Sequence, residues 1–313
     1  MEPVYDVLIA GAGPAGLTAG IYVARARLNG LLLEEKTPGG SPATTDRIDN
    51  YPGFPEGVDG VELMERFRSQ AARLGLEMKL FDPVNTVEND AEVKTIHTDE
   101  GDLQARALIL ATGHKPAKLG VPGEDEFHGR GVSYCATCDG AFFKEKQVMV
   151  VGGGNAAVEE AVFLTRFASK VYLVHCRDRL RASKIVQEKA LANPKIEFIW
   201  KSNLSEVVGD SKVHAARVVN VEDGSETTVP VDGVFMYVGN QPNSEMVRGL
   251  VELDEHGYIV TGPDFATSMP GIFAAGDVRS GSIKQVIVAA GEGAQAAMNA
   301  QRYVERAAGT AYE

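Results

Sequence analysis

The segment DVLIAGAGPAG, residues 6–16, decides the fold class of this 313-residue chain. Its apolar first half predicts a buried strand, and the alanine-rich sequence that follows predicts a helix. Between them, Gly11, Gly13 and Gly16 satisfy the G-x-G-x-x-G pattern of dinucleotide-binding folds. The first glycine permits a tight turn, the second lets a pyrophosphate approach the backbone, and the third lets helix and strand pack closely.

The sequence around this glycine turn completes a nucleotide-binding unit. The helix begins near Pro14 and Ala15, and its N-terminus would supply free N–H groups and partial positive charge to phosphates. An apolar strand over residues 31–33 follows and ends in Glu34. An acidic side chain at that strand end is placed to accept hydrogen bonds from a ribose.

The same order of strand, glycine turn, helix and strand recurs over residues 148–174, around GGGNAA at residues 152–157. From Gly152 to His175, just after the second strand, is 23 residues, which equals the spacing from the first glycine to the strand-end acid in the first copy. Two copies of this unit predict an α/β protein with two Rossmann-like dinucleotide-binding domains.

Strands outside the second copy indicate that its domain is inserted into the first. Buried-strand patterns end in Ala-Thr-Gly at residues 111–113 and, much later, in Gly-Asp at residues 276–277. An alanine-rich helix is expected over residues 285–306, and proline-containing linkers are expected near residues 115–122 and 240–243. We therefore expect an outer domain, residues 1–114 and 244–313, and an inner domain, residues 115–243.

The second copy carries a basic segment where the first has its strand-end acid. His175 opens the sequence HCRDRLR, residues 175–181. Cations at this strand end favour a 2′-phosphate, as in NADPH, over the free ribose hydroxyl of NADH. Arg177 and Arg181 are four residues apart, so on a helical turn they would converge on one phosphate. A solvated basic turn is the alternative interpretation.

The sequence CATCD, residues 135–139, places two cysteines at C-x-x-C spacing beside an acid. Such a pair can close a small disulfide. Zinc ligation would need two more ligands, and only Cys176 and His175 are available, on adjacent positions that tend to point in opposite directions. Two buried, reduced cysteines are a further alternative. With two dinucleotide folds, the simplest interpretation is electron transfer from nicotinamide through flavin to this disulfide, with Asp139 as proton donor or acceptor.

Composition and charge narrow the class of protein. The formal net charge of −12 argues against a sequence-independent nucleic-acid binder and against a binder of anionic membranes. No apolar run approaches the roughly 20 residues that a membrane-spanning helix needs, and the N-terminal sequence lacks the basic and then apolar layout of a signal peptide. Three cysteines are too few for a disulfide framework, so we expect a cytoplasmic protein without a metal centre.

Together these features resemble the bacterial low-molecular-weight thioredoxin reductases along nearly the whole chain. The sequences that carry the resemblance are GAGPAG (11–16), PGG (38–40), NYPGFPEG (50–57), ATG (111–113), GVSYCATCDG (131–140), GGGNAAVEEA (152–161), GIFAAGDV (271–278) and KQVIVAAGEGAQAA (284–297). The Cys-Ala-Thr-Cys-Asp core in this context is highly specific, whereas the glycine loops by themselves indicate only a flavoprotein.

The resemblance implies FAD in the outer domain, NADPH in the inner domain, a thioredoxin-like protein disulfide as substrate, and a homodimer. It implies that Cys138 is the thiol next to the flavin, that Cys135 attacks the disulfide of thioredoxin, and that Asp139 is the acid or base. The implied FAD contacts are Gly11, Gly13, Pro14, Ala15, Gly16, Glu34, Gly40, Asn50, Thr112, Gly113, Gly276, Asp277, Lys284, Gln285 and Val286. The implied NADPH contacts are Gly152, Gly154, Asn155, Ala156, His175, Arg177 and Arg181.

Three positions depart from the family pattern. Cys176 stands where the family usually has the first arginine of a His-Arg-Arg-x-x-x-Arg motif, which leaves NADH or ferredoxin open as alternative electron donors. Ser41 replaces the usual glutamine after PGG, and Glu292 replaces an aspartate in the C-terminal helix. Two further alternatives are a flavoprotein like ferredoxin–NADP reductase, whose relatives lack the active C-x-x-C, and a redox sensor that binds nucleotide without turnover.

Overall fold

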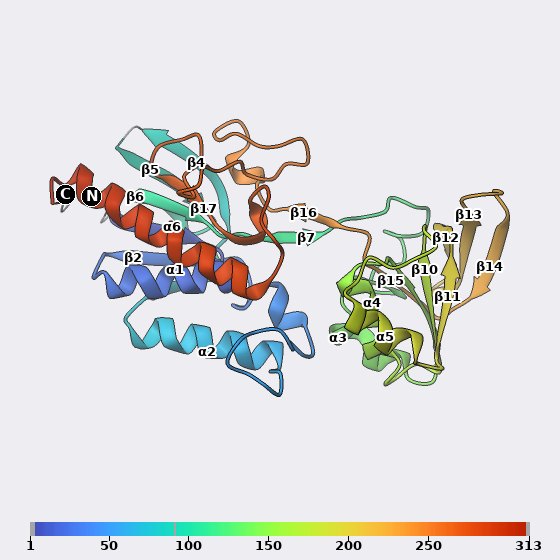
Figure 1. Ribbon diagram of the computed structural model, residues 1–313. Helices are drawn as coiled ribbons and strands as arrows, with labels where there is room; N and C mark the ends of the chain where they lie inside the picture. The colour runs from blue at the N-terminus through green and yellow to red at the C-terminus, as the bar shows by residue number, and fades with distance from the viewer. Residues whose placement is uncertain (1–3, 91, 311–313) are drawn as a thin grey trace. The chain divides into compact units, whose positions relative to one another are not determined.

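The computed structural model describes residues 4–90 and 92–310 and divides into two compact units (Figure 1). The first unit comprises Met1–Lys115 and Gln241–Glu313, and the second comprises Pro116–Asn240. The ends of the predicted outer domain, residues 1–3 and 311–313, lie outside the described residues. The second unit is therefore formed by a continuous stretch of chain that interrupts the first.

A mixed sheet forms the centre of the first unit. The central strands β1 (Tyr5–Ala10) and β6 (Gly101–Leu110) are parallel neighbours. Their second halves, residues 7–10 and 107–110, pair with each other and are buried, which explains the apolar runs at these positions. The sheet order is β3 (Glu77–Leu80), β2 (Gly30–Glu34), β1, β6, β5 (Val93–Thr98) and β4 (Val84–Asp90), with β17 (Ile272–Ala274) also paired to β6.

Two helices from opposite ends of the chain pack closely in the first unit. They are α1 (Pro14–Arg25) and α6 (Val286–Ala307), and a third helix, α2 (Gly60–Arg73), lies against α1. A Cβ on Gly293 of α6 would overlap the carbonyl oxygen of Ala15. Glycine and alanine at the contact therefore let the two backbones approach closely, and this fixes the C-terminal helix beside the glycine turn.

The second unit contains a parallel sheet of Rossmann type and a smaller antiparallel sheet. The parallel order is β11 (Ile196–Trp200), β10 (Lys170–His175), β9 (Gln147–Val151), β15 (Gly233–Met236) and β8 (Val132–Ser133). The antiparallel strands are β12 (Ser202–Gly209), β13 (Val213–Asn220) and β14 (Glu226–Pro230). The helices are α3 (Ala136–Asp139), α4 (Asn155–Leu164) and α5 (Lys184–Leu191).

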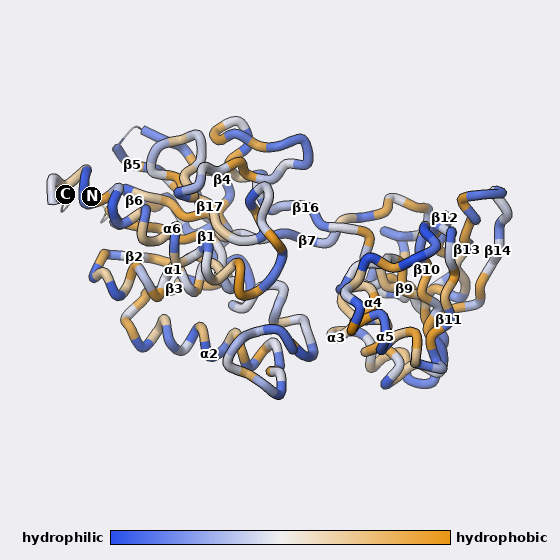
Figure 2. The backbone as a smooth tube through the Cα atoms, viewed as in Figure 1, coloured by the Kyte–Doolittle hydropathy of each residue, from blue (hydrophilic) through white to orange (hydrophobic). Residues whose placement is uncertain are grey.

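Hydrophobic residues follow the strands of each unit, as Figure 2 shows. In the second unit, Val150, Leu173 and Phe235 are completely buried, and the ring of Phe235 meets that of Phe143 edge-on. Each such side chain contributes about 1.5–3 kcal/mol through burial. The predicted α/β class with two Rossmann-like units is confirmed.

The two segments where the chain crosses between units pair with each other. They form a two-stranded sheet of β7 (His114–Pro116) and β16 (Asn240–Pro242). On the first-unit side, the hydroxyl of Thr112 donates to the carbonyl of Asn243 at 2.5 Å, and Asn243 Nδ2 donates back to the carbonyl of Thr112 at 2.9 Å. Short 3₁₀ segments occur at Ser41–Thr44 (η1), Gly140–Phe143 (η2), Glu245–Val247 (η3) and Gly276–Val278 (η4).

Helix α6 is 22 residues long, yet it carries charged residues at positions 292, 302, 305 and 306. Within residues 4–90 and 92–310, no helix is both long and apolar enough to cross a membrane.

Candidate functional site

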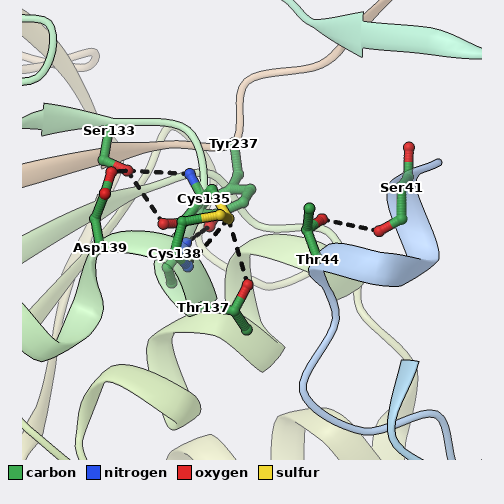
Figure 3. Close-up of a disulfide and its surroundings, with 9 residues drawn as sticks. Ser41, Thr44, Ser133, Cys135, Thr137, Cys138, Asp139 and Tyr237 are labelled. Atoms are coloured by element: carbon green, nitrogen blue, oxygen red, sulfur yellow. Dashed lines mark hydrogen bonds between the residues drawn. A yellow bond between two sulfur atoms is a disulfide. The ribbon is translucent and has the colours of Figure 1, made fainter. Parts of the chain in front are cut away.

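The two cysteines of the C-x-x-C sequence form a disulfide at the start of α3. The sulfur atoms of Cys135 and Cys138 are 2.07 Å apart (Figure 3). Cys135 caps the helix, because its Sγ accepts a hydrogen bond from the backbone N–H of Cys138 at 3.2 Å. The hydroxyl of Thr137 lies 3.3 Å from the same sulfur. Neither zinc ligation nor a pair of free thiols describes this arrangement.

Residues from neighbouring strands hold the disulfide loop. Ser133 ends β8, and its hydroxyl lies 2.6 Å from Oδ2 of Asp139 and 3.1 Å from the backbone N–H of Cys135. Tyr237 follows β15, which pairs with β8, and its phenol oxygen accepts the N–H of Ala136 at 3.0 Å (Figure 3). Burial, followed by the nearby carboxylates, raises the pKa of Tyr237 above its ordinary value, so the phenol remains protonated.

The first glycine turn has the shape that a bound pyrophosphate needs. Gly11 has a φ of +104°, and a Cβ there would overlap the carbonyl oxygen of Ala111. A Cβ on Gly16 would overlap the carbonyl oxygen of Gly11, so this position packs against the turn. In contrast, the nearest atom to a Cβ on Gly13 is the Cα of Gly40, at 3.9 Å. Space is therefore left in front of Gly13, at the uncapped N-terminus of α1.

Glu34 lies at the end of β2, as the sequence predicted. Its carboxylate also forms a hydrogen bond to the backbone of the glycine turn. Its Oε2 accepts the N–H of Ala12 at 2.6 Å, and its Oε1 accepts the N–H of Lys36 at 2.9 Å. Each carboxylate oxygen has a second lone pair. Glu34 therefore retains acceptor capacity for a ribose hydroxyl while it holds the loop in place.

A buried ion pair supports the segment that carries Asp277. Glu292 of α6 accepts the N–H of Gly276 at 2.7 Å, and the Arg279 guanidinium donates to both of its carboxylate oxygens at 3.0 and 3.1 Å. Nδ1 of His114 lies 3.1 Å from Oδ2 of Asp277, whose buried Oδ1 has no hydrogen-bond partner among the described residues. A hydroxyl-rich ligand such as a ribityl chain would supply a donor for this oxygen.

Other predicted FAD contacts also gather in the first unit. Asn50 Nδ2 donates to Oε1 of Gln285 at 2.7 Å, which joins two predicted contacts that are far apart in sequence. Gln285 is the N-cap of α6 and Val286 its first residue. Lys284 Nζ contacts the hydroxyl of Tyr258 at 2.6 Å, so this lysine already has a partner. The remaining predicted contact, Gly113, has a φ of +63° and ends the buried strand pattern.

The second glycine turn repeats the geometry of the first. Gly152 has a φ of +146°, and a Cβ there would overlap the carbonyl oxygen of Tyr237. Nothing lies within 4 Å of a Cβ on Gly154, which precedes α4. Asn155 begins α4 and its Oδ1 accepts the N–H of Ser183 at 2.7 Å, while Ala156 is exposed. This turn therefore also leaves space for phosphate at a helix N-terminus.

The basic segment after β10 differs from its predicted conformation. The segment between β10 and α5 is not helical, so the expected helical turn that would converge Arg177 and Arg181 is wrong. Both arginines are exposed, whereas His175 is only 5% exposed and its ring packs against Gly153. Burial lowers the pKa of His175, and the charges of Arg181 and Arg177 lower it further. A neutral ring beside two exposed cations results.

Four residues that position the site escaped the sequence analysis. They are Ser133, Tyr237, His114 and Arg279. Ser133 and His114 contact the predicted residues Asp139 and Asp277, whereas Tyr237 and Arg279 act through Ala136 and Glu292. Glu292 was noted only as a departure from the family pattern. The position of Ser133, two residues before the first cysteine, was the one local signal available.

Two Rossmann-like units with open glycine turns, together with a C-x-x-C disulfide, define a flavin- and nicotinamide-linked disulfide reductase. The chain belongs to the pyridine nucleotide-disulphide oxidoreductase family, whose sequence profile matches residues 5–293. It is 49% identical to a thioredoxin reductase from Listeria monocytogenes, over 97% of this chain and 95% of the relative. A thioredoxin reductase from Bacillus subtilis is 46% identical over 97% and 96% of the two chains.

Solved structures give the same result. The crystal structure of Lactococcus lactis thioredoxin reductase superposes with a TM-score of 0.95 at 44% identity, over 96% of this chain and 99% of that one. A ferredoxin-flavin thioredoxin reductase from Clostridium acetobutylicum is 33% identical with a TM-score of 0.53, over 97% and 98% of the chains. The predicted resemblance to bacterial thioredoxin reductases is confirmed.

Proposed function

We propose that the protein is an FAD-dependent thioredoxin-disulfide reductase. Electrons would pass from NADPH by way of FAD and the Cys135–Cys138 pair to the disulfide of a thioredoxin-like protein. The observation that carries this proposal is the C-x-x-C disulfide, which is held beside Asp139 in a chain 49% identical to a thioredoxin reductase. The proposal predicts that Cys138→Ser abolishes thioredoxin turnover while the donor still bleaches the flavin absorbance. Turnover that persists in Cys138→Ser would refute it.

The first unit has the features needed to hold FAD. The open space at Gly13 and the uncapped start of α1 suit a pyrophosphate, Glu34 suits the adenosine ribose, and Asp277 suits the ribityl chain. When bound, a flavin supplies the two-electron chemistry that links a nicotinamide to a disulfide. The chain's own contribution is to place acceptors, donors and empty space where that cofactor needs them.

Hydrogen bonds favour Cys135 as the thiol that attacks the protein substrate. Its Sγ receives the N–H of Cys138 and the hydroxyl of Thr137, and both contacts would stabilise a thiolate after reduction. The Cys135 thiolate attacks the substrate disulfide, which forms a mixed disulfide and releases one substrate thiol. Cys138 then attacks the sulfur of Cys135, which releases the second substrate thiol and restores the Cys135–Cys138 disulfide.

Asp139 is the proposed acid and base of this exchange. It follows Cys138 directly and is partly buried, and its carboxylate accepts the hydroxyl of Ser133. A group in this position can give a proton to a leaving thiolate and take one from an attacking thiol. Asp139→Asn keeps the shape but cannot exchange a proton, so turnover with thioredoxin should fall about 10²-fold or more.

NADPH is the proposed electron donor. Arg177 and Arg181 are exposed beyond β10 and both act electrostatically on His175, which supports a 2′-phosphate site built from two guanidinium groups. NADH or ferredoxin is the alternative, because Cys176 replaces an arginine and a relative is a ferredoxin-flavin thioredoxin reductase. Anaerobic titration of the flavin absorbance separates the three donors. Bleaching by NADPH at near-stoichiometric amounts, with NADH much poorer, supports the proposal.

A homodimer in the cytoplasm completes the proposal. Tyr22 on α1 and Ile287 and Met298 on α6 are large apolar side chains that are 39%, 44% and 43% exposed. Residues 287 and 298 are eleven apart, which places them on one face of α6. Such a face suits a second copy of the chain. Sedimentation equilibrium should give twice the mass of the chain, and cell fractionation tests the location.

A further inference from the structure

Ser133 is a buried hydroxyl that connects the reactive cysteine to Asp139. It is 3% exposed and lies at the end of β8, opposite Phe235 of β15. Its Oγ lies 2.6 Å from Oδ2 of Asp139, 3.1 Å from the N–H of Cys135 and 3.2 Å from the carbonyl oxygen of Cys135 (Figure 3). One hydroxyl therefore has two acceptors and one donor within reach.

Ser133, Asp139 and the backbone of Cys135 form a cluster whose hydrogen bonds can rearrange while the hydroxyl and the carboxyl group each keep a partner. When Asp139 is ionised, the Ser133 hydroxyl donates to Oδ2 over the shorter distance and accepts the N–H of Cys135. When Asp139 is protonated, its O–H donates to Ser133 Oγ, and the serine proton turns to the carbonyl of Cys135. Asp139 therefore has a hydrogen-bond partner in both protonation states, which avoids the free-energy penalty of a buried polar group without a partner.

We propose that Ser133 is a positioning residue that keeps Asp139 hydrogen-bonded in both of its protonation states during the exchange of thiols and disulfides. This inference rests on the proposed acid–base role of Asp139. Ser133 gains and loses no net proton, since its own proton only changes acceptor. The proton that Asp139 takes comes from a thiol, and the proton that it gives goes to a leaving thiolate of the proposed exchange.

Two further titratable groups face this cluster besides the cysteines. The phenol oxygen of Tyr237 accepts from Ala136, and the carboxylate of Glu160 on α4 acts electrostatically on Tyr237. The raised pKa of Tyr237 keeps it protonated over the working range of pH. A pH dependence that vanishes in Asp139→Asn therefore belongs to Asp139 and to neither of these groups.

The test is the pH profile of thioredoxin turnover by the holoenzyme of Ser133→Ala. Removing the hydroxyl takes a donor from the ionised carboxylate. The limb of the profile that disappears in Asp139→Asn should therefore move upward by about one pH unit, and kcat should fall about 10-fold with little change in KM. Ser133→Thr retains the hydroxyl and should restore the profile. If Ser133→Ala does not fold, Ser133→Val is compared with Ser133→Thr, which has nearly the same shape and keeps the hydroxyl: the limb should move upward in Ser133→Val only.

Ser202→Ala is the matched control. Ser202 is 5% exposed in the same unit, and its hydroxyl donates to the carbonyl of Trp200 at 2.9 Å, away from the disulfide. An equal change in Ser133→Ala and Ser202→Ala, or an unshifted limb in Ser133→Ala, would overturn the inference. Full activity of Asp139→Asn would instead overturn the proposed role of Asp139 itself, so the two failures are distinguishable.

Discussion

Replacing Glu292 by alanine should destabilise the first unit more than the removal of a surface ion pair does. The Glu292 side chain is 8% exposed and that of Arg279 is 18% exposed. The substitution leaves the Arg279 guanidinium, the N–H of Gly276 and the hydroxyl of Ser282 without the carboxylate that accepts all three. The segment that loses its support carries Asp277.

The size of the effect follows from this burial. Removing one partner of a buried, hydrogen-bonded ion pair costs about 3–5 kcal/mol. A unit of this size changes its Tm by about 2–4 °C for each kcal/mol, so the melting temperature should fall by roughly 6–20 °C. Thermal release of FAD, followed by flavin fluorescence, reports the first unit specifically.

Glu62→Ala provides the control, because Glu62 pairs with Arg66 on the surface of α2, with side chains 53% and 61% exposed. An exposed pair is worth about 0.2–1 kcal/mol, so this variant should melt within about 4 °C of the parent. If Glu292→Ala melts as close to the parent as Glu62→Ala does, the ion pair does not support the Asp277 segment.

Three further predictions concern the nucleotide sites. Gly13→Ala should leave the Tm of the FAD-free protein unchanged, because the φ of −78° at Gly13 suits alanine and the nearest atom is 3.9 Å from the new Cβ. The new methyl group should nevertheless weaken FAD binding by ~10–100-fold in fluorescence titrations. Arg177→Ala should raise the KM for NADPH about 10-fold and leave the KM for NADH unchanged. His175→Asn should flatten the loss of stability on acidification. In the parent, the pKa of His175 is lower in the folded chain than in the unfolded chain, so the unfolded chain binds a proton first as pH falls through about 6.5, and stability is lost. If the unfolding free energies of the parent and of His175→Asn change equally between pH 7 and pH 5, this prediction is wrong.

Features set by local backbone chemistry could be predicted from the sequence. Gly11, Gly13 and Gly16 have three different roles, and the structure gives each of them the space or the contact that the pattern implies. The strand-end positions of Glu34 and His175 follow from the same repeat. These predictions succeed because a turn between a buried strand and a helix restricts its residues strongly.

Features set by tertiary contacts could not be predicted in this way. The basic segment is not helical, and its backbone is anchored by the N–H of Arg181 to the carbonyl of Gly153 and by the N–H of Ser183 to Asn155. Arg279 and Glu292 are thirteen residues apart and meet only because η4 folds back on α6. No periodic pattern in the sequence predicts such a pair, so it could be found only from the structure.

The central claim is that donor electrons reach the Cys135–Cys138 disulfide through a bound flavin. Anaerobic titration of the holoenzyme with NADPH, with thiols counted after denaturation, tests it most directly. The account predicts that the parent takes up about two equivalents, since flavin and disulfide each accept two electrons, and that Cys138→Ser takes up about one. Uptake of one equivalent by both proteins, with the disulfide of the parent still intact, would contradict it.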